Sequence, residues 1–240
     1  MRKVIYTAII GDYDNLEEPT YIPPGYDFIC FTDQKLHKPD SVWNIKQVLP
    51  LYGDNTRTAR KYKVLPHRYL SEYDVSIWVD GNELIVGDVS ELENKFLKNS
   101  NMAIYNHMSC WAKRNCLYQE AATILNFGAI NMTKTPSKGV LNYKDNPTVI
   151  KHQVERYRNE GYPDNNGLIV SGVMYRKHNS ADVINCMEAW WDEIKYGSKR
   201  DQLSFNYAAW KTETEFNWIN QDIRDDGYML EVKHTHQGKK

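Results

Sequence analysis

Short apolar runs, rich in β-branched and aromatic residues and bounded by turn-forming residues, recur along the chain, as is typical of buried strands. They cover residues 4–10, 26–32, 42–49, 75–79, 102–106, 167–176 and 228–233. Between several of these runs, apolar residues recur at helical spacing or capping residues mark the ends of a segment. This alternation predicts an α/β fold with a mostly parallel mixed sheet and helices on both faces.

The expected helices have recognisable ends. Pro66 ends or kinks a helix that starts near Thr56, because proline removes a backbone donor. Asn146 and Pro147 open another helix, and Gly161 accepts the left-handed conformation in which that helix ends. Further helices are expected over residues 115–127 and 180–196, and after Ser198.

The overall charge gives no reason to expect a nucleic acid partner. The chain has 240 residues, of which 41% are hydrophobic, enough for the core of one large α/β domain spanning residues 1–240. Lysine and arginine number 30 and aspartate and glutamate 31, so the net charge is −1. Any site for an anionic ligand must therefore be local.

Cysteine usage and the N-terminus predict a cytoplasmic protein. The four cysteines are scattered in a chain long enough to fold without disulfides, which favours reduced thiols. The first apolar run is short and lacks the small-residue cleavage site of a signal peptide. No transmembrane segment is expected, because no stretch approaches the roughly 20 apolar residues that cross a bilayer. Action at a membrane would require recruitment by another protein or by a local patch.

The strand at residues 75–79 leads directly into Asp80, Gly81 and Asn82. Ligands of parallel sheets bind beyond the carboxyl ends of strands. In an extended segment Asp80 and Asn82 point to the same side, and Gly81 lets the backbone bend closely around a ligand. Their oxygens suit Mg²⁺ or Mn²⁺. The alternative is an Asx-type turn that joins two strands.

Three further groups of polar residues are candidates for chemistry. Arg57, Arg60 and Lys61 share a helix face that suits a diphosphate, although the same spacing describes a solvated basic stripe. Asp201 follows Ser198 by three residues and either completes a helix cap or, with Gln202, acts on a sugar. His234 and His236 are either exposed tail residues or a source of a third metal ligand.

These features, in this order, resemble the GT-A glycosyltransferases. The closest resemblance is to the family that contains plant turgor-regulation and seed-mucilage glycosyltransferases and bacterial capsule-locus members. It covers roughly residues 4–210, in the stretches YTAIIGDYD, FICFTD, RTARKYKVLPHRYL, SIWVDGN, RNCLYQEA, SGVMYRKHN and RDQLSFNYA. The pair SGVM and DQ more distantly resembles glycogenin-like retaining enzymes, in which an asparagine stands at the position of Ser171.

The resemblance implies a Rossmann-like GT-A domain with a nucleotide-sugar half over about residues 1–100 and an acceptor half over about residues 101–240. On the donor side it implies nucleotide, diphosphate or sugar contacts for Thr7, Arg57, Arg60, Lys61, Gly81, Ser171 and Gly172. It implies Mn²⁺ or Mg²⁺ at Asp80, Asn82 and either His234 or His236, catalytic roles for Asp201 and Gln202, and acceptor contacts for His107, Arg114 and Glu120. Asn82 replaces the second aspartate of many relatives, which makes the metal site less charged.

The resemblance implies metal-dependent transfer of a hexose from a nucleoside diphosphate sugar, with UDP as the expected nucleotide, to a glycan hydroxyl in surface polysaccharide or glycoconjugate biosynthesis. The Asp-Gln resemblance favours retention of configuration; in an inverting enzyme Asp201 becomes the general base. A homodimer is left open, because GT-A domains often pair.

Two other functions remain open from the sequence. The 17 tyrosines and 7 tryptophans would provide stacking surfaces in a non-catalytic glycan-binding protein, although a core also uses such rings. A metal-dependent phosphohydrolase would also bind a metal and a diphosphate, but such enzymes usually have more carboxylates than one aspartate and one asparagine.

Overall fold

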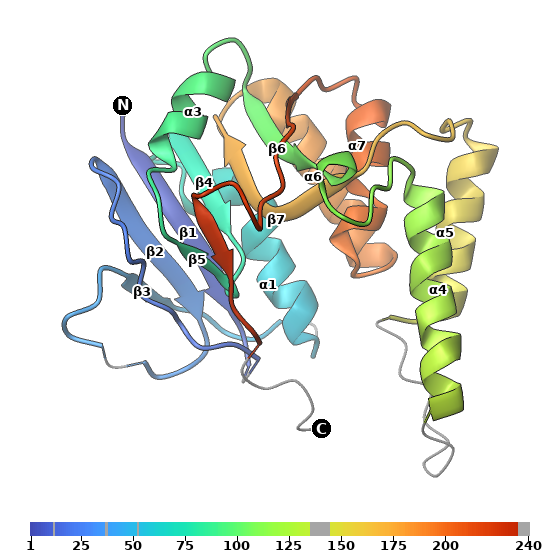
Figure 1. Cartoon of the computed structure of the whole chain (residues 1–240), viewed down its shortest axis with the longest axis horizontal. Helices are drawn as coiled ribbons and strands as arrows, with labels where there is room; N and C mark the ends of the chain where they lie inside the picture. Colours follow the sequence, from blue (N-terminus) through green and yellow to red (C-terminus); the bar gives the residue numbers. More distant parts are fainter. Residues whose placement is uncertain (12, 37, 52, 135–144, 235–240) are drawn as a thin grey trace.

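The computed structural model describes residues 1–11, 13–36, 38–51, 53–134 and 145–234. In this part of the chain a seven-stranded sheet has the order β3-β2-β1-β4-β7-β6-β8 (Figure 1). Its strands are β1 (Lys3–Ile9), β2 (Tyr26–Thr32), β3 (Asn44–Gln47), β4 (Val75–Val79), β6 (Met102–Asn106), β7 (Ile169–Arg176) and β8 (Asn217–Ile219). The sheet thus combines strands from both halves of the sequence.

The sheet is mixed but mostly parallel, as predicted. Strand β1 pairs in parallel with β2 and β4, β2 with β3, and β6 with β8. Strand β7 is antiparallel to both neighbours, β4 and β6. As a result, the carboxyl ends of β1, β4 and β6 lie at the same edge of the sheet as the amino end of β7.

Both faces of the sheet are covered, because alternate side chains of β1 belong to two different cores. Val4, Tyr6 and Ala8 belong to a core on one face, packed against α1 (Asn55–Val64), α2 (Pro66–Tyr69), α6 (Ala181–Tyr196) and α7 (Phe205–Lys211). Ile5 and Ile9 face the opposite core. That core is covered by α3 (Ser90–Phe96) and by a second, two-stranded sheet of β5 (Glu83–Ile85) and β9 (Met229–Glu231).

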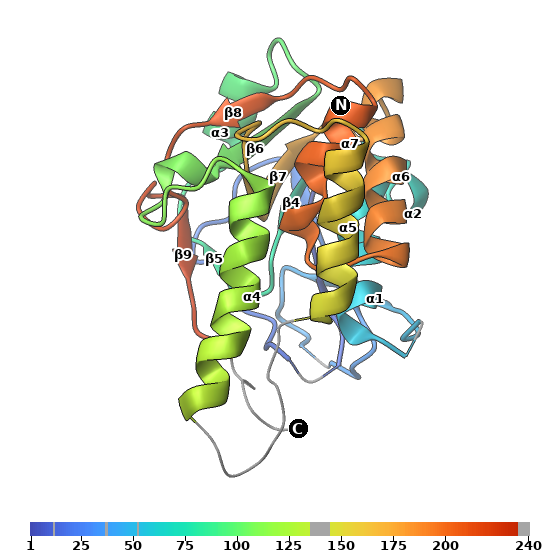
Figure 2. The same cartoon turned by 90° about the vertical axis from the view of Figure 1, so that its right-hand side faces the viewer.

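Two further helices complete the described fold. Helices α4 (Leu117–Lys134) and α5 (Pro147–Asn159) run side by side in both views (Figures 1 and 2). The predicted cap of α5 is confirmed, because the Asn146 side chain accepts hydrogen bonds from the backbone N–H groups of Thr148 and Val149. Helix α5 packs on α7 through stacked rings of Tyr157 and Tyr207, 3.7 Å apart.

Most predicted elements are confirmed, and the differences have local causes. Helix α1 ends at Val64, and Pro66 begins the short helix α2. The predicted cap at Ser198 is wrong: its hydroxyl donates to Asp145 at 2.6 Å, and the chain forms a 3₁₀ turn, η2 (Asp201–Leu203), before α7 begins. Strands β5 and β8 were not predicted, because three residues are too few for a periodic pattern.

The four cysteines are buried and free, in agreement with the expected reduced thiols. Across the residues that the structure describes, no helix is both long enough and apolar enough to cross a membrane.

A buried histidine after β7 makes stability depend on pH. His178 is fully buried, and its Nε2 lies 2.9 Å from the carbonyl of Leu70. Burial lowers the pKa of His178 from 6.5 to about 4. Its neutral form therefore contributes stability that is present above pH 6.5 and lost as the pH falls through 4.

We therefore expect the wild-type protein to lose more stability than His178→Gln between pH 6.5 and pH 4, measured by urea unfolding at each pH. His152→Gln, on the exposed side of α5, serves as the control and should follow the wild type. Parallel curves for all three proteins would contradict the assignment.

Candidate functional site

Asp80 lies directly after β4, at the edge of the sheet where the parallel strands end. Its Oδ1 accepts hydrogen bonds from Lys63 Nζ at 3.1 Å and Trp78 Nε1 at 2.7 Å, and Arg60 lies 3.7 Å away. The backbone N–H of Asp80 donates to the carbonyl of Gly172 at 2.8 Å. Residues 80–83 also form a turn in which the N–H of Glu83 donates to the carbonyl of Asp80. The predicted turn is therefore present, but it does not involve the Asp80 carboxylate, which pairs with the basic residues.

A second carboxylate meets the same lysine. Asp201 Oδ2 lies 2.7 Å from Lys63 Nζ and 3.1 Å from Arg60 Nε, and it accepts from the Ser171 hydroxyl at 3.0 Å. The Lys63 side chain is fully buried and the Asp201 side chain is 3% exposed. Lys63 therefore holds together two carboxylates that are far apart in the sequence.

The surroundings keep Asp201 ionised. Burial alone raises the pKa of its carboxyl, but Arg60 and Lys63 outweigh burial and hold the pKa well below its usual range. A carboxylate with so low a pKa is a poor proton acceptor at neutral pH. The arrangement therefore suits Asp201 to stabilising and positioning positive charge.

Two glycines allow a close approach at this edge. A Cβ atom at Gly81 would lie 3.3 Å from Ile9 and 3.4 Å from Asp14, and one at Gly172 would lie 3.2 Å from Glu83 Oε1. Burial, aided by the charge of Asp80, raises the pKa of Glu83 to about 8. A mostly protonated carboxyl group thus lies beside the Asp80 turn at neutral pH.

The C-terminal segment reaches the same place. The backbone N–H of Val232 donates to the carbonyl of Asn82 at 2.8 Å, which extends the pairing of β5 with β9. His234 Nδ1 lies 2.8 Å from Asp14 Oδ1. His236 lies outside the described residues. Within the described ranges, no three His, Cys, Asp or Glu side chains are grouped closely enough to hold a metal ion by themselves.

The other predicted donor-side residues have different neighbours. Arg57 donates to Asp54 and to the carbonyls of Ile194 and Gly197 at the end of α6. The Lys61 ammonium lies over the ring of Tyr69. Of the three basic residues predicted on one face, only Arg60 contacts the two carboxylates.

Thr7 lies inside β1 and is 2% exposed. Its hydroxyl has no hydrogen-bond partner among the residues that the structure describes. A nucleotide could therefore contact Thr7 only by approaching β1 itself, because the side chain does not reach the surface.

The three predicted acceptor residues form one connected cluster. Arg114 donates from its backbone to His107 Nδ1 at 3.2 Å, and its guanidinium lies 2.7 Å from Glu120. Desolvation, together with Arg114, lowers the pKa of His107, so its ring is neutral at pH 7. The backbone N–H of His107 donates to the carbonyl of Leu168, next to the residue whose carbonyl accepts from Gln202. The cluster and the Asp201–Gln202 turn thus meet at the start of β7.

The sequence of the chain matches a known protein family. The family profile described as TOD1/MUCI70, glycosyltransferase-like domain, matches residues 1–234. The chain belongs to this family. The resemblance expected from the sequence motifs is thereby confirmed.

One curated relative of the family is the Arabidopsis thaliana protein named Probable hexosyltransferase MUCI70. It is 26% identical over 243 aligned residues, which cover 90% of this chain but only 38% of that protein. Among solved structures, the apo form of the bifunctional glycosyltransferase WbbM aligns with 85% of this chain and 37% of its own, with a TM-score of 0.43 and 10% identity.

Sequence reasoning missed four residues that complete the site: Lys63, Trp78, Asp14 and Glu83. Lys63 follows Arg60 by three residues, so helical spacing places both on one face of α1. The sequence signal for the burial of Lys63 was its position inside the apolar stretch YKVL. Asp14 and Glu83 gave no comparable signal, because their partners come from distant segments.

We expect Lys63→Met to lower the free energy of unfolding by about 3–5 kcal/mol, because it leaves buried Asp201 with one cation fewer. Lys61→Met, two positions earlier on the same helix, should have a much smaller effect, since its charge makes only a ring contact. Urea unfolding of both variants is the measurement. Equal stability of the two variants would show that the Lys63 contacts are not essential to the fold.

Proposed function

We propose that this protein transfers a hexose from a nucleoside diphosphate sugar, with UDP as the nucleotide, to a glycan hydroxyl. Family membership supports a glycosyltransferase, and the name of the Arabidopsis relative supports a hexose as the transferred group. The observation that carries the proposal is the meeting of Asp80 and Asp201 on Lys63 at the edge where ligands of parallel sheets bind. The proposed setting is surface polysaccharide or glycoconjugate synthesis in the cytoplasm.

Mn²⁺ or Mg²⁺ is part of this proposal. All the basic contacts to Asp80 are made through Oδ1, and no described residue donates to Oδ2. Oxygen ligands suit these cations, which usually take one or two carboxylates and complete their shell with water and substrate phosphates. Asp80 would hold the ion with Asn82 and His234. When bound, it neutralises the charge that develops on the leaving diphosphate.

The chain's own residues would do the remaining work. Arg60 adds positive charge beside Asp80, where it would favour the departing diphosphate. Asp201 would hold Lys63, Arg60 and Ser171 in place and face the cationic character that a sugar develops during transfer. His107, Arg114 and Glu120 form a preassembled polar cluster that suits an acceptor hydroxyl.

The same electrostatics support retention of anomeric configuration. An inverting enzyme needs a base for the acceptor proton, and the low pKa of Asp201 makes it unsuited to that task. We therefore propose a retaining reaction in which Asp201 and Gln202 border the donor sugar and the acceptor.

The first test is UDP binding by calorimetry with and without Mn²⁺. We expect Mn²⁺ to strengthen UDP binding in the wild type, and Asp80→Asn to lose this enhancement and the transfer activity. Asp74→Asn, at the opposite end of β4, is the matched control and should keep both. A protein that binds glycans but neither UDP nor Mn²⁺ would be a lectin, and one that releases phosphate without an acceptor would be a phosphohydrolase.

The second test is the configuration of the product. With a donor sugar found by screening nucleotide sugars for transfer, the first product seen by proton NMR should have the same anomeric configuration as the donor. An inverted product would overturn the retaining proposal. If Asp201→Asn then failed to form this inverted product, Asp201 would be assigned as the general base.

A further inference from the structure

A groove of about 740 Å³ lies between the end of α5, helix α7 and the segment that leads into β8. This volume is within the range of small-molecule sites. The groove is lined by Asn166, Asn206, Trp210, Glu213, Phe216 and Trp218, among others. None of these residues belongs to the candidate site at Asp80.

The aromatic side chains of this groove are held rigidly. Trp210 is 38% exposed, and its ring packs edge-on against Tyr162 at 5.5 Å. Trp218 packs against Phe216, with ring centres 4.7 Å apart. Fixed indole rings that are partly open to solvent can contact a ligand at little cost in side-chain entropy.

One buried amide in the groove has an unused donor. Asn206 is 4% exposed, and its Oδ1 accepts from the backbone N–H of Ile169 at 3.2 Å. No described residue accepts from its Nδ2. Gly167 leaves this group uncovered, since a Cβ there would lie 3.2 Å from Nδ2 and 2.8 Å from Trp218. Nδ2 is not among the fully buried atoms that lack a partner, so it is reached by solvent and its N–H is available to a ligand in the groove.

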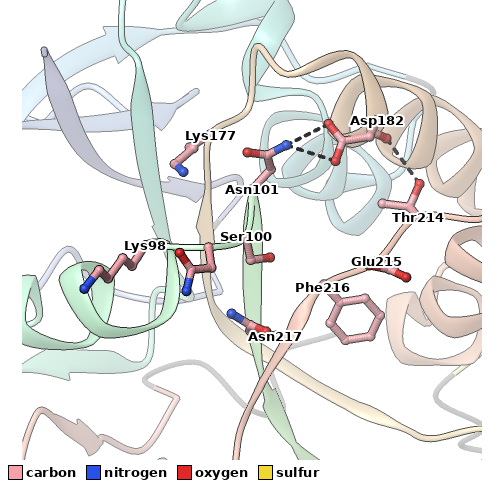
Figure 3. Close-up of a pocket in the computed structure, with 10 residues that line it drawn as sticks. Lys98, Ser100, Asn101, Lys177, Asp182, Thr214, Glu215, Phe216 and Asn217 are labelled. Atoms are coloured by element: carbon pink, nitrogen blue, oxygen red, sulfur yellow. Dashed lines mark hydrogen bonds between the residues drawn. The ribbon is translucent and has the colours of Figure 1, made fainter.

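A neighbouring groove shows the contrast. It has a volume of about 690 Å³ and shares Thr214, Glu215 and Phe216 with the Trp210 groove as lining residues (Figure 3). There the Asn101 amide donates to the Asp182 carboxylate, and the Thr214 hydroxyl donates to the Asp182 carbonyl. These polar groups satisfy one another, so this groove carries no comparable evidence for a ligand.

We propose that the groove at Trp210 binds a neutral segment of a glycan. The apolar face of a sugar ring would pack on the indole, and a hydroxyl would accept from Asn206 Nδ2. Glu213 and Glu215 are exposed and form no ion pair with a described residue, while the Lys211 ammonium is paired with Glu160 at 3.0 Å. This negative surface disfavours uronates and phosphates.

The groove also adjoins the candidate active site. Ile169 donates its N–H to Asn206 in the groove, and its carbonyl accepts from Gln202. A glycan in the groove would therefore lie close to the start of β7, where the acceptor cluster and the Asp201–Gln202 turn meet. The inference that the groove holds the acceptor chain rests on the proposed function, whereas the inference that the groove binds a glycan does not.

The test is an NMR titration of the indole N–H signals with β-1,4-linked gluco-, manno- and galactotetraose, without nucleotide. At least one should shift the Trp210 or Trp218 signal. Trp210→Ala should weaken this binding at least about tenfold, and Trp111→Ala, at an 82% exposed tryptophan elsewhere, should leave it unchanged. Asn206→Asp keeps an acceptor for Ile169 but removes the free donor, so it should also weaken binding.

The proposal is overturned if none of the three tetraoses shifts either signal, if Trp210→Ala binds as the wild type does, or if a tetragalacturonate binds more tightly than all three. Thermal unfolding checks that each variant is folded. Asp80→Asn separates this proposal from the proposed function: it should abolish metal-enhanced UDP binding and leave tetraose binding intact.

Discussion

The buried charge of Lys63 is the constraint on which the rest of the site depends. Taking an ammonium out of water costs several kcal/mol, and the interior must supply opposite charges in good geometry to offset this. Here one carboxylate comes from the end of β4, 17 residues after Lys63, and the other from a turn 138 residues after Lys63. The need to pair Lys63 holds α1, β4 and the turn before α7 in one arrangement, and helical spacing then brings Arg60 to the same carboxylates.

The antiparallel insertion of β7 adds the second half of the site. Because β7 runs against β4 and β6, its first residues lie at the edge where those strands end. The carbonyl of Gly172 holds Asp80, that of Ile169 holds Gln202, and that of Leu168 holds His107. Backbone groups at the start of β7 and of the residue before it thus bring Asp80, the Asp201–Gln202 turn and the cluster of His107, Arg114 and Glu120 together.

The two surfaces of the molecule that we assign to sugars differ in their physical character. The Asp80 edge is rich in charge and lies at the ends of the strands, as suits a diphosphate and its leaving-group charge. The Trp210 groove has aromatic faces, an amide open to solvent and two carboxylates that form no ion pair with a described residue, as suits a neutral sugar chain. Ile169 is hydrogen-bonded both to Asn206 in the groove and to Gln202 beside the candidate site, so the proposed acceptor would extend from one to the other.

The sequence by itself determined the fold class, most strands, the cap at Asn146, the end of a helix before Pro66 and the resemblance to the family, because apolar periodicity, capping and motifs are local properties. It also marked Asp80, Asp201 and the acceptor residues as candidates. Only the tertiary structure decided that Asp201 is part of a buried ion network and not a helix cap, that Arg60 and not Arg57 or Lys61 meets the carboxylates, and that Lys63 lies between them. It also determined that the short strands β5 and β9 pair with each other. The physical reason is that burial, ion pairing and strand pairing depend on residues that are close in space and distant along the chain.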